Sequence, residues 1–186
     1  VIPKTDDRPR WTERKCTGKL VGWIADNRYT DAGELPPDTD LGLVTDRTCF
    51  YAEAGGQIGD EGVICTETGR FTVTSTVKVG SAVVHVGSLT EGKMSIGQQA
   101  DLQVSEEREF TRKNHTTTHL LHWALRSVLG DHIEQRGSRV KPDEFTFDFS
   151  HDSQVTLDER ARVERMVNEK IYQDLPVEAR EYGIDE

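Results

Sequence analysis

Two histidines four residues apart are the sharpest chemical feature of the sequence. On a helix, His115-Thr116-Thr117-Thr118-His119 would place both imidazoles on one face, one turn apart, where they could bind the same metal ion. Zinc proteases use this spacing with a glutamate directly after the first histidine, and Thr116 at that position disfavours a protease. His122 extends the same face as a candidate third ligand. The alternative is that histidines on a half-buried helix serve packing or hydrogen bonding.

A glycine pair followed by glutamine is the second candidate. Gly55-Gly56-Gln57 lies within the segment of residues 50–60. Adjacent glycines allow positive φ or a close approach of the backbone to a ligand, and Gln57 could position a water or an amide. The same tripeptide occurs at the catalytic tip of peptide release factors. Because glycine pairs are ordinary turn residues, a tight barrel turn is the alternative.

A polar run with two cations, Gln135-Arg136-Gly137-Ser138-Arg139, is the third candidate, and by itself it is typical of a solvated strand. Basic residues gather around it and would suit a few phosphate contacts. Charges of this kind also serve solubility on helix surfaces. The basic residues are Arg108, Arg112, Lys113, Arg126, Arg136, Arg139 and Lys141.

Composition limits the classes of protein to which these residues can belong. The 186 residues suffice for one large or two small domains, and 33 acidic against 23 basic residues give a net charge of −10. This balance excludes binding of DNA or RNA through bulk positive charge. No apolar run approaches the roughly 20 residues that span a bilayer. The chain starts at Val1 without Met and stops abruptly after Glu186, so we expect an excerpt from a longer protein.

The cysteines indicate the compartment. Cys16, Cys49 and Cys65 are odd in number and widely spaced, and the chain has neither a C-x-x-C motif nor a secretory signal. Such usage is typical of a reducing environment, and we expect a cytoplasmic protein.

The first half of the chain must position the glycine pair, and its pattern is one of short strands. Residues 1–15 are polar with two prolines, and we expect a linker or frayed lead-in. Residues 16–104 alternate β-type runs with turns, for example at Asp60-Glu61-Gly62, which predicts a small barrel or sandwich. The expected strands are residues 19–24, 41–45, 71–76, 82–86 and 99–104.

The sequence pattern changes near Ser105, and residues 105–186 predict an α+β fold with helices as well as strands. An amphipathic helix is predicted over residues 114–129 with Gly130 as its stop. Thr156-Leu157-Asp158-Glu159 is a capping box that opens a second helix carrying Leu157, Ala161, Val167 and Ile171. Strands are expected at residues 132–140, 144–149 and 176–180.

Four motifs, in their order and spacing, resemble the editing region of alanyl-tRNA synthetases and their free-standing relatives. They are residues 50–60, 114–121, 135–138 and 147–151. The resemblance covers nearly all of the chain from about residue 16 onward. It implies an α+β fold in which a small β-barrel precedes an α+β editing core similar to that of threonyl- and alanyl-tRNA synthetases. It also favours a zinc site over simple packing for the two histidines.

The resemblance implies hydrolysis of the ester that joins a wrong serine or glycine to tRNA(Ala), while the parent enzyme attaches alanine using ATP and Mg. An alanine pocket cannot reject these amino acids by binding alone, because the differences are worth only about 1–3 kcal/mol. By resemblance, the zinc ligands are His115 and His119, and the amino acid or terminal adenosine contacts Thr118, Gln135 and Ser138. The remaining site residues are Gly55, Gly56 and Gln57, with Arg112, Lys113, Arg136 and Arg139 for the tRNA acceptor end.

One departure from the family pattern concerns the metal. The family completes its zinc site with a Cys-x-x-x-His motif, and this sequence contains none. We therefore expect half a zinc site and weak hydrolysis by this stretch alone. Two alternatives stay open, a non-catalytic tRNA-binding or structural module and an unrelated zinc hydrolase that uses His115, His119 and His122.

Overall fold

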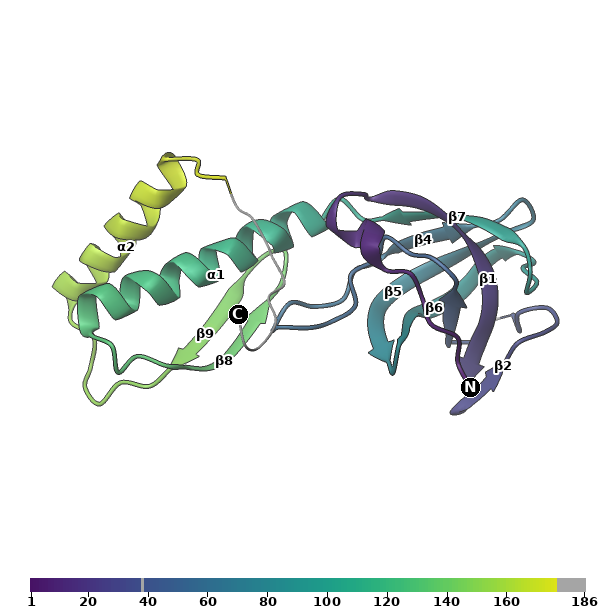
Figure 1. Cartoon of the computed structure of the whole chain (residues 1–186), viewed down its shortest axis with the longest axis horizontal. Coiled ribbons are helices and arrows are strands. Elements are labelled where there is room, and N and C mark those ends of the chain that lie inside the picture. The colour runs from purple at the N-terminus through teal and green to yellow at the C-terminus, as the bar shows by residue number, and fades with distance from the viewer. Residues whose placement is uncertain (38, 177–186) are drawn as a thin grey trace, which may run out of the picture. The chain divides into compact units, whose positions relative to one another are not determined.

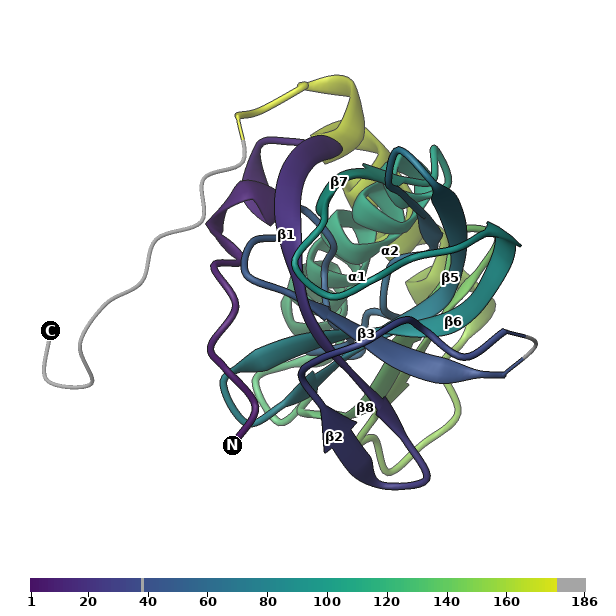
Figure 2. The same cartoon turned by 90° about the vertical axis from the view of Figure 1, so that its right-hand side faces the viewer.

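A closed six-stranded barrel forms from the first part of the chain (Figure 1). The computed structural model describes residues 1–37 and 39–176. The strands are β1 (Lys15–Ala25), β2 (Arg28–Thr30), β3 (Leu41–Thr45), β4 (Gly62–Cys65), β5 (Gly69–Val79), β6 (Ala82–Gly92) and β7 (Gln99–Val104). The order around the barrel is β1-β3-β6-β5-β4-β7, and β1 pairs with β7 to close it (Figure 2), while β2 extends β1 as a hairpin.

This architecture confirms the predicted α+β fold with its β-barrel and decides against a sandwich. Side chains of β7 alternate between exposed and buried, as the sequence pattern predicts. β4 was not predicted, and the turn expected at Asp60-Glu61-Gly62 is wrong at Gly62, where this strand begins. β4 has only four residues and no clear alternation, so its pairing with β5 and β7 makes it a strand.

The barrel interior is apolar and fixes the start of the glycine-containing segment. Leu20, Leu43, Ile64 and Phe71 are completely enclosed. Burial of each such side chain contributes roughly 1.5–3 kcal/mol relative to exposure. Phe50 belongs to the same core and is also fully buried. The segment that contains the glycine pair therefore begins at an anchored residue.

The lead-in before β1 is attached to the barrel, which differs from the linker that we expected. The Thr5 hydroxyl donates to the Thr45 carbonyl at 3.1 Å and accepts from the Val83 amide at 3.1 Å. Pro9 is buried within a short 3-10 helix, η1 (Arg8–Trp11). The polar composition of this segment gave no sign of the attachment, because its hydrogen bonds go to backbone groups distant in sequence.

A long helix and a two-stranded sheet carry the remaining candidate residues. α1 (Arg108–Leu129) begins six residues before the predicted residue 114, and Gly130 ends it with a φ of +117°. The Ser105 hydroxyl accepts the Glu107 amide at 3.3 Å just ahead of this helix. The predicted strands form as β8 (Gln135–Val140) and β9 (Phe145–Phe149), which pair with each other.

The last described helix is α2 (Leu157–Tyr172), and its start confirms the predicted capping box. The Thr156 side chain accepts the Glu159 amide, and the Glu159 side chain accepts the Thr156 amide. Val163 and Val167 are the buried residues of α2, whereas Leu157 and Ile171 are exposed. Residues 177–180 of the predicted final strand lie outside the described residues.

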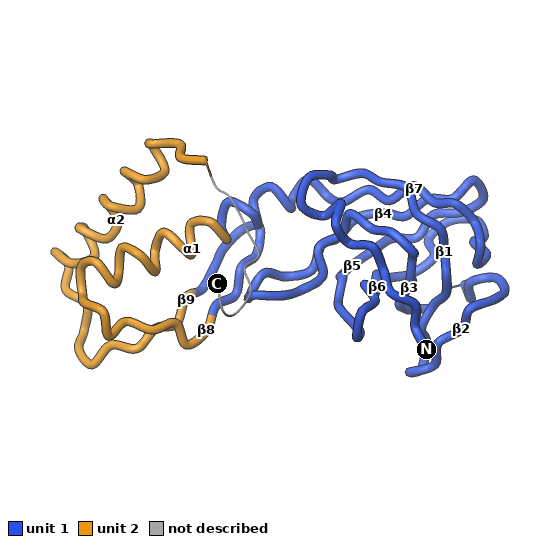
Figure 3. The backbone as a smooth tube through the Cα atoms, viewed as in Figure 1, with its two compact units in different colours: residues 1–114, 138–146 blue, residues 115–137, 147–186 orange. Residues whose placement is uncertain are grey.

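The chain divides into two compact units, each described by itself (Figure 3). Unit 1 contains Val1–Asn114 and Ser138–Thr146, and unit 2 contains His115–Gly137 and the described residues from Phe147 onward. α1 and the β8-β9 hairpin thus contribute residues to both units. None of the helices in the described residues has the length and apolar character that a membrane span requires.

Candidate functional site

The Gly-Gly-Gln segment forms a tight two-residue turn in unit 1. Ala54 and Gln57 exchange both backbone hydrogen bonds, at 3.2 and 3.0 Å. Gly55 and Gly56 lie between them with φ of +59° and +80°. Two consecutive positive φ values define the type I′ turn, which explains why the sequence places glycine at both positions. The alternative of a tight turn is therefore correct for the backbone, although the turn lies outside the barrel strands.

This turn pairs with β8, which carries another predicted site residue. The Ile58 amide donates to the Val140 carbonyl at 3.2 Å, and the Val140 amide donates to the Gly56 carbonyl at 2.8 Å. Gly56 also lies directly against Ser138, so that a Cβ at Gly56 would overlap the Ser138 hydroxyl. The structure thus brings together two motifs that are about 80 residues apart in the sequence.

The base of the segment is closed by Asp60. Its amide donates to the Tyr51 carbonyl at 2.9 Å, and its carboxylate oxygen Oδ2 accepts the Tyr51 amide at 2.7 Å. The Thr76 hydroxyl on β5 donates to the Asp60 carbonyl at 2.7 Å. Residues 51–60 therefore form a closed loop whose ends are bonded to each other and to the barrel. Both the tip and the base of this loop have defined backbone partners.

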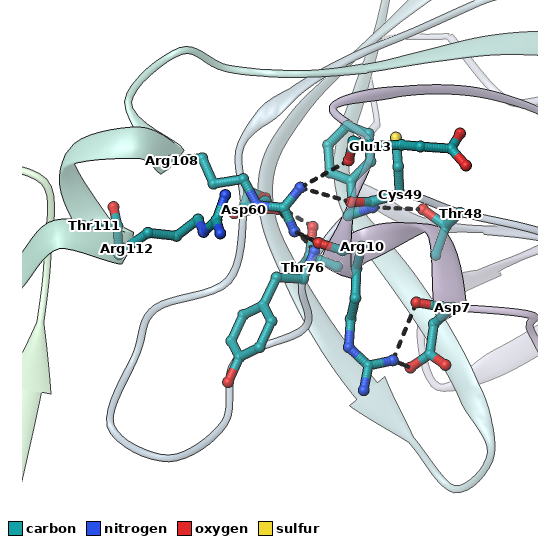
Figure 4. Close-up of polar contacts among 12 residues, drawn as sticks. Asp7, Arg10, Glu13, Thr48, Cys49, Asp60, Thr76, Arg108, Thr111 and Arg112 are labelled. Carbon is teal, nitrogen blue, oxygen red and sulfur yellow. Dashed lines mark hydrogen bonds and ion pairs between the residues drawn. The ribbon is translucent and has the colours of Figure 1, made fainter. Parts of the chain in front are cut away.

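Arg108, at the start of α1, is the counter-charge for Asp60 (Figure 4). Its Nη2 lies 3.3 Å from Asp60 Oδ2, and each side chain is only 4% exposed. Nη2 also donates to the Arg10 carbonyl at 2.7 Å, and Nη1 donates to the carbonyls of Cys49 and Glu13 at 2.9 and 3.2 Å. Burial raises the pKa of Asp60 to about 6, against the opposing effects of Arg108 and the Tyr51 amide. The pair is consequently ionised at neutral pH.

A second buried polar network fixes the strand end that precedes the loop. The ring of His85 is fully enclosed, with Nδ1 3.0 Å from the Leu43 carbonyl and Nε2 2.8 Å from the Thr48 hydroxyl. Because a carbonyl only accepts, Nδ1 carries the proton and Nε2 accepts from Thr48. The Thr48 oxygen in turn accepts the Phe50 amide at 3.1 Å. Burial lowers the pKa of His85 to about 4, so this imidazole is neutral.

The two candidate metal ligands lie together in unit 2. The rings of His115 and His119 stack with centroids 5.1 Å apart and planes inclined by 21°. Burial, and secondly the neighbouring His119, lower the pKa of His115 and favour the neutral imidazole that metals bind. Within residues 1–37 and 39–176, no group of three His, Cys, Asp or Glu side chains is arranged to hold a metal ion.

His122 is not grouped with the pair, because the described residues contain no cluster of three His, Cys, Asp or Glu side chains placed to hold a metal ion, and the three-histidine alternative stays a prediction. Its ring contacts Phe147 with centroids 5.3 Å apart. The buried Nε2 of His122 has no hydrogen-bond partner in the part of the chain that the structure describes. A helical spacing of three residues places His122 near the face of the pair, but its ring packs against β9 instead.

The remaining predicted site residues differ in their surroundings. Thr118 is 4% exposed, while Gln135 is exposed on β8. Three of the four predicted tRNA contacts have local partners. Arg112 lies 3.7 Å from Glu109, Lys113 lies over the Phe110 ring at 5.6 Å, and Arg136 lies 3.1 Å from Glu134. Arg139, the fourth, is exposed.

Asp60 and Arg108 are the residues that sequence reasoning missed. Arg108 was grouped with the surface cations, yet its guanidinium is buried and its partners are three backbone carbonyls and one carboxylate. Backbone acceptors leave no pattern in a sequence.

Comparison with known proteins decides the family. The family model described as tRNA synthetases class II (A) matches residues 2–108, more than half of the chain. The alanine–tRNA ligase of Paracoccus denitrificans is 50% identical over 165 residues, which cover 88% of this chain. This chain belongs to the alanyl-tRNA synthetase family.

Two further members of that family give the same result. The alanine–tRNA ligase of Halorhodospira halophila is 44% identical over 91% of this chain, and that of Acetivibrio thermocellus is 40% identical over 95%. The chain spans about a fifth of the length of these curated relatives, between 18 and 20%. The match to the family model ends at Arg108, the first residue of α1, whereas the similarity to the alanyl-tRNA synthetases extends beyond it.

Proposed function

We propose that this chain comprises most of an editing domain that hydrolyses serine or glycine wrongly attached to tRNA(Ala). A synthetase that selects alanine needs such a second step, because one hydroxyl or one methyl group changes binding by only about 1–3 kcal/mol. Membership of the alanyl-tRNA synthetase family supports the proposal. The observation that carries it is the joining of the Gly55-Gly56-Gln57 turn to β8 beside Ser138.

The joined turn and strand suit recognition of an aminoacyl ester. The Ser138 hydroxyl can donate and accept hydrogen bonds, so it can hold either an ester carbonyl or an amino group. Gly56 keeps its backbone against Ser138 only because it has no side chain. We assign Thr118, Gln135 and Ser138 to contacts with the amino acid or the terminal adenosine. Rigid backbone bonds on both sides of the turn would supply the orientation that hydrolysis of a bound ester requires.

Zinc is part of this proposal in a limited form. His115 and His119 supply two nitrogen ligands one helical turn apart, whereas a protein zinc site usually takes three or four protein ligands. The described residues do not complete such a set, so we derive no step of the reaction through a metal. We propose that residues 1–186 bind zinc weakly and hydrolyse the ester slowly.

The tRNA contacts and the parent activity complete the proposal. Arg112, Lys113, Arg136 and Arg139 would meet phosphates near the acceptor end of tRNA(Ala), since local cations suit such contacts even in a chain of net charge −10. We further propose that the full-length polypeptide attaches alanine to tRNA(Ala) with ATP and Mg in the cytoplasm.

The test compares residues 1–186 with the full-length polypeptide that carries this sequence. Hydrolysis of serine-charged and glycine-charged tRNA(Ala) is followed with radiolabelled amino acid, and bound zinc is counted by mass spectrometry. We expect stoichiometric zinc and hydrolysis in the full-length polypeptide, with little of either in residues 1–186. His119→Gln should remove both from the full-length form, while His122→Gln, a substitution on the same helix, should leave zinc in place.

Two outcomes would overturn the proposal. Full-length polypeptide that binds tRNA(Ala) but hydrolyses neither ester would indicate a non-catalytic module. Stoichiometric zinc in residues 1–186 that is lost in His122→Gln would show that our assignment of the metal ligands is wrong.

A further inference from the structure

The connections of Arg108 extend beyond a simple ion pair. Its guanidinium meets four acceptors in unit 1, and three of them are backbone carbonyls of Arg10, Glu13 and Cys49. These carbonyls belong to the lead-in and to the segment that precedes the glycine turn. A planar fork with five donors can satisfy several acceptors at once in one geometry, and lysine cannot reproduce this arrangement.

The surroundings of the pair leave little room for a ligand. The cavity beside Asp60 and Arg108 measures about 20 Å³ and is bounded by Ile58, Gly59, Thr111 and Pro142 among others. Such a volume holds about one water molecule and no amino acid or nucleotide. A buried ion pair is also weak evidence for stability, because apolar residues of similar size often serve a core equally well. The geometry that the pair imposes is therefore the more direct explanation of its presence.

A continuous set of bonds leads from Arg108 to the candidate site. Asp60 Oδ2 meets both Arg108 and the Tyr51 amide, which closes the loop of residues 51–60 at its base. At the tip of the same loop, Gly56 and Ile58 are bonded to Val140. A shift of Asp60 would move the loop and with it the contact between Gly56 and Ser138.

The same helix is fixed to the end of β8 at a second point. The side-chain amide of Asn114 donates to the carbonyls of Lys141 and Pro142 at 2.8 and 3.2 Å. The first two turns of α1 are thus bonded to the base of the glycine loop through Arg108 and to the residues after β8 through Asn114. The bonds of Arg108 and Asn114 therefore hold the two segments, the glycine loop and the end of β8, whose pairing keeps Gly56 against Ser138.

We propose that Arg108 is a positioning residue for ester hydrolysis, because it holds the base of the Gly55-Gly56-Gln57 loop and thereby the contact of Gly56 with Ser138. The inference rests on the proposed function and assigns a role to a residue that touches neither substrate nor metal. Arg108 acts through Asp60 and the loop, so its loss should slow the reaction without weakening the binding of tRNA.

The test uses the full-length polypeptide with one single variant, one double variant and one control. Arg108→Lys keeps the positive charge beside Asp60 and removes the planar guanidinium group with its five donors. The double variant Asp60→Asn, Arg108→Met removes both charges, so that a folded protein without the ion pair is available. Arg70→Lys is the matched control, because Arg70 is exposed on β5 of the same unit and has no assigned role in binding or hydrolysis.

Single-turnover hydrolysis of serine-charged tRNA(Ala) provides the first measurement. Displacements of about 1 Å commonly cost about 100-fold in rate, so we expect kcat to fall about 10- to 100-fold in both Arg108 variants. KM should stay within about twofold, as it should in the control. Hydrogen–deuterium exchange should speed up in peptides that contain Ile58 and Val140, whose amides bond the loop to β8, while peptides from β3 and β6 stay unchanged.

The outcomes separate this inference from the function on which it rests. Folded Arg108 variants with unchanged kcat, or with unchanged exchange at Ile58 and Val140, would overturn the positioning role. Absence of hydrolysis in the unsubstituted polypeptide would refute the proposed function instead, and exchange at Ile58 would still decide whether Arg108 fixes the loop.

Discussion

In unit 1 the glycine turn is held by backbone bonds and a buried ion pair, whereas in unit 2 the histidine pair lies on a helix that packs on a small apolar core. The glycine turn is bonded at its tip to Val140 and at its base through Asp60. The unit 2 core takes Ala124 and Leu125 from α1, both C-terminal to the histidine pair. The first arrangement is complete within the described residues, whereas the second has two histidines and no group of three potential metal ligands within those residues.

The difference shows which features can be tested by single substitutions. Where several backbone groups depend on one side chain, its removal displaces a whole segment. If the histidine pair binds zinc as proposed, replacement of one histidine should change metal binding and leave the fold in place.

The largest expected effect on stability comes from Arg108→Met. The substitution leaves the Asp60 carboxylate buried beside three unpaired carbonyls, and loss of one partner of a buried pair costs about 3–5 kcal/mol. Urea unfolding of residues 1–186 at pH 7 should show a decrease of that size. The double variant with Asp60→Asn should recover much of it, and an equal loss in both variants would contradict the role given to the charge pair.

The second effect depends on pH and concerns His85. Its pKa is lowered to about 4 in the folded protein, so between that value and its ordinary pKa the unfolded chain binds the additional proton. The stability that the neutral ring contributes is complete above about pH 6.5 and is lost as the pH falls toward 4. From pH 7 to pH 5 this loss is about 2 kcal/mol.

The measurement is the free energy of unfolding in urea, compared between the unsubstituted chain and His85→Gln at pH 7 and at pH 5. Asp60 acts in the opposite direction, because its raised pKa of about 6 makes stability fall as the pH rises through that value. That contribution is common to both proteins and cancels in the comparison. A pH dependence identical in the two proteins would show that His85 does not titrate as described.

The third prediction separates the two requirements for glycine in the turn. Gly55→Ala places a Cβ at positive φ in open space, whereas Gly56→Ala adds an overlap with the Ser138 hydroxyl to a similar backbone cost. We expect a loss of about 1 kcal/mol for Gly55→Ala and a larger one for Gly56→Ala. Hydrolysis by the full-length polypeptide should fall at least about 10-fold only in Gly56→Ala. Equal hydrolysis rates in the two variants would show that the contact of Gly56 with Ser138 does not affect the reaction.

The smallest effect is expected in unit 2. Thr156→Ala removes the hydroxyl that accepts the Glu159 amide at 3.3 Å and should cost about 1 kcal/mol in thermal or urea unfolding. Thr156→Ser keeps the oxygen and should restore most of the stability. Hydrolysis should be unaffected by both substitutions, because α2 carries none of the assigned site residues.

Local patterns predicted most elements of the fold. The capping box at Thr156, the stop at Gly130 and the strand pattern of residues 144–149 act within a few residues, and all three are present in the structure. β4 escaped prediction because partners from β5 and β7 define it.

The candidate site was predicted less completely than the fold. Residue type pointed to Gly56 and the family resemblance pointed to Ser138, and the structure joins them. Sequence gave no indication that Arg108 is buried, since its partner Asp60 lies 48 residues earlier and its other acceptors are backbone carbonyls. The same limitation applied to Thr5, whose bonds go to backbone groups of β3 and β6.

The pairing of β1 with β7 has a consequence for how the protein is made. Lys15 lies opposite Gln103, so the first barrel strand cannot find its final partner until nearly ninety further residues have left the ribosome. Contacts this distant in sequence slow folding and leave a strand edge exposed meanwhile. Synthesis of α1 then adds Arg108, whose bonds to the carbonyls of Arg10 and Glu13 hold the segment before β1. We therefore expect the barrel to close late, after the residues of β7 have left the ribosome.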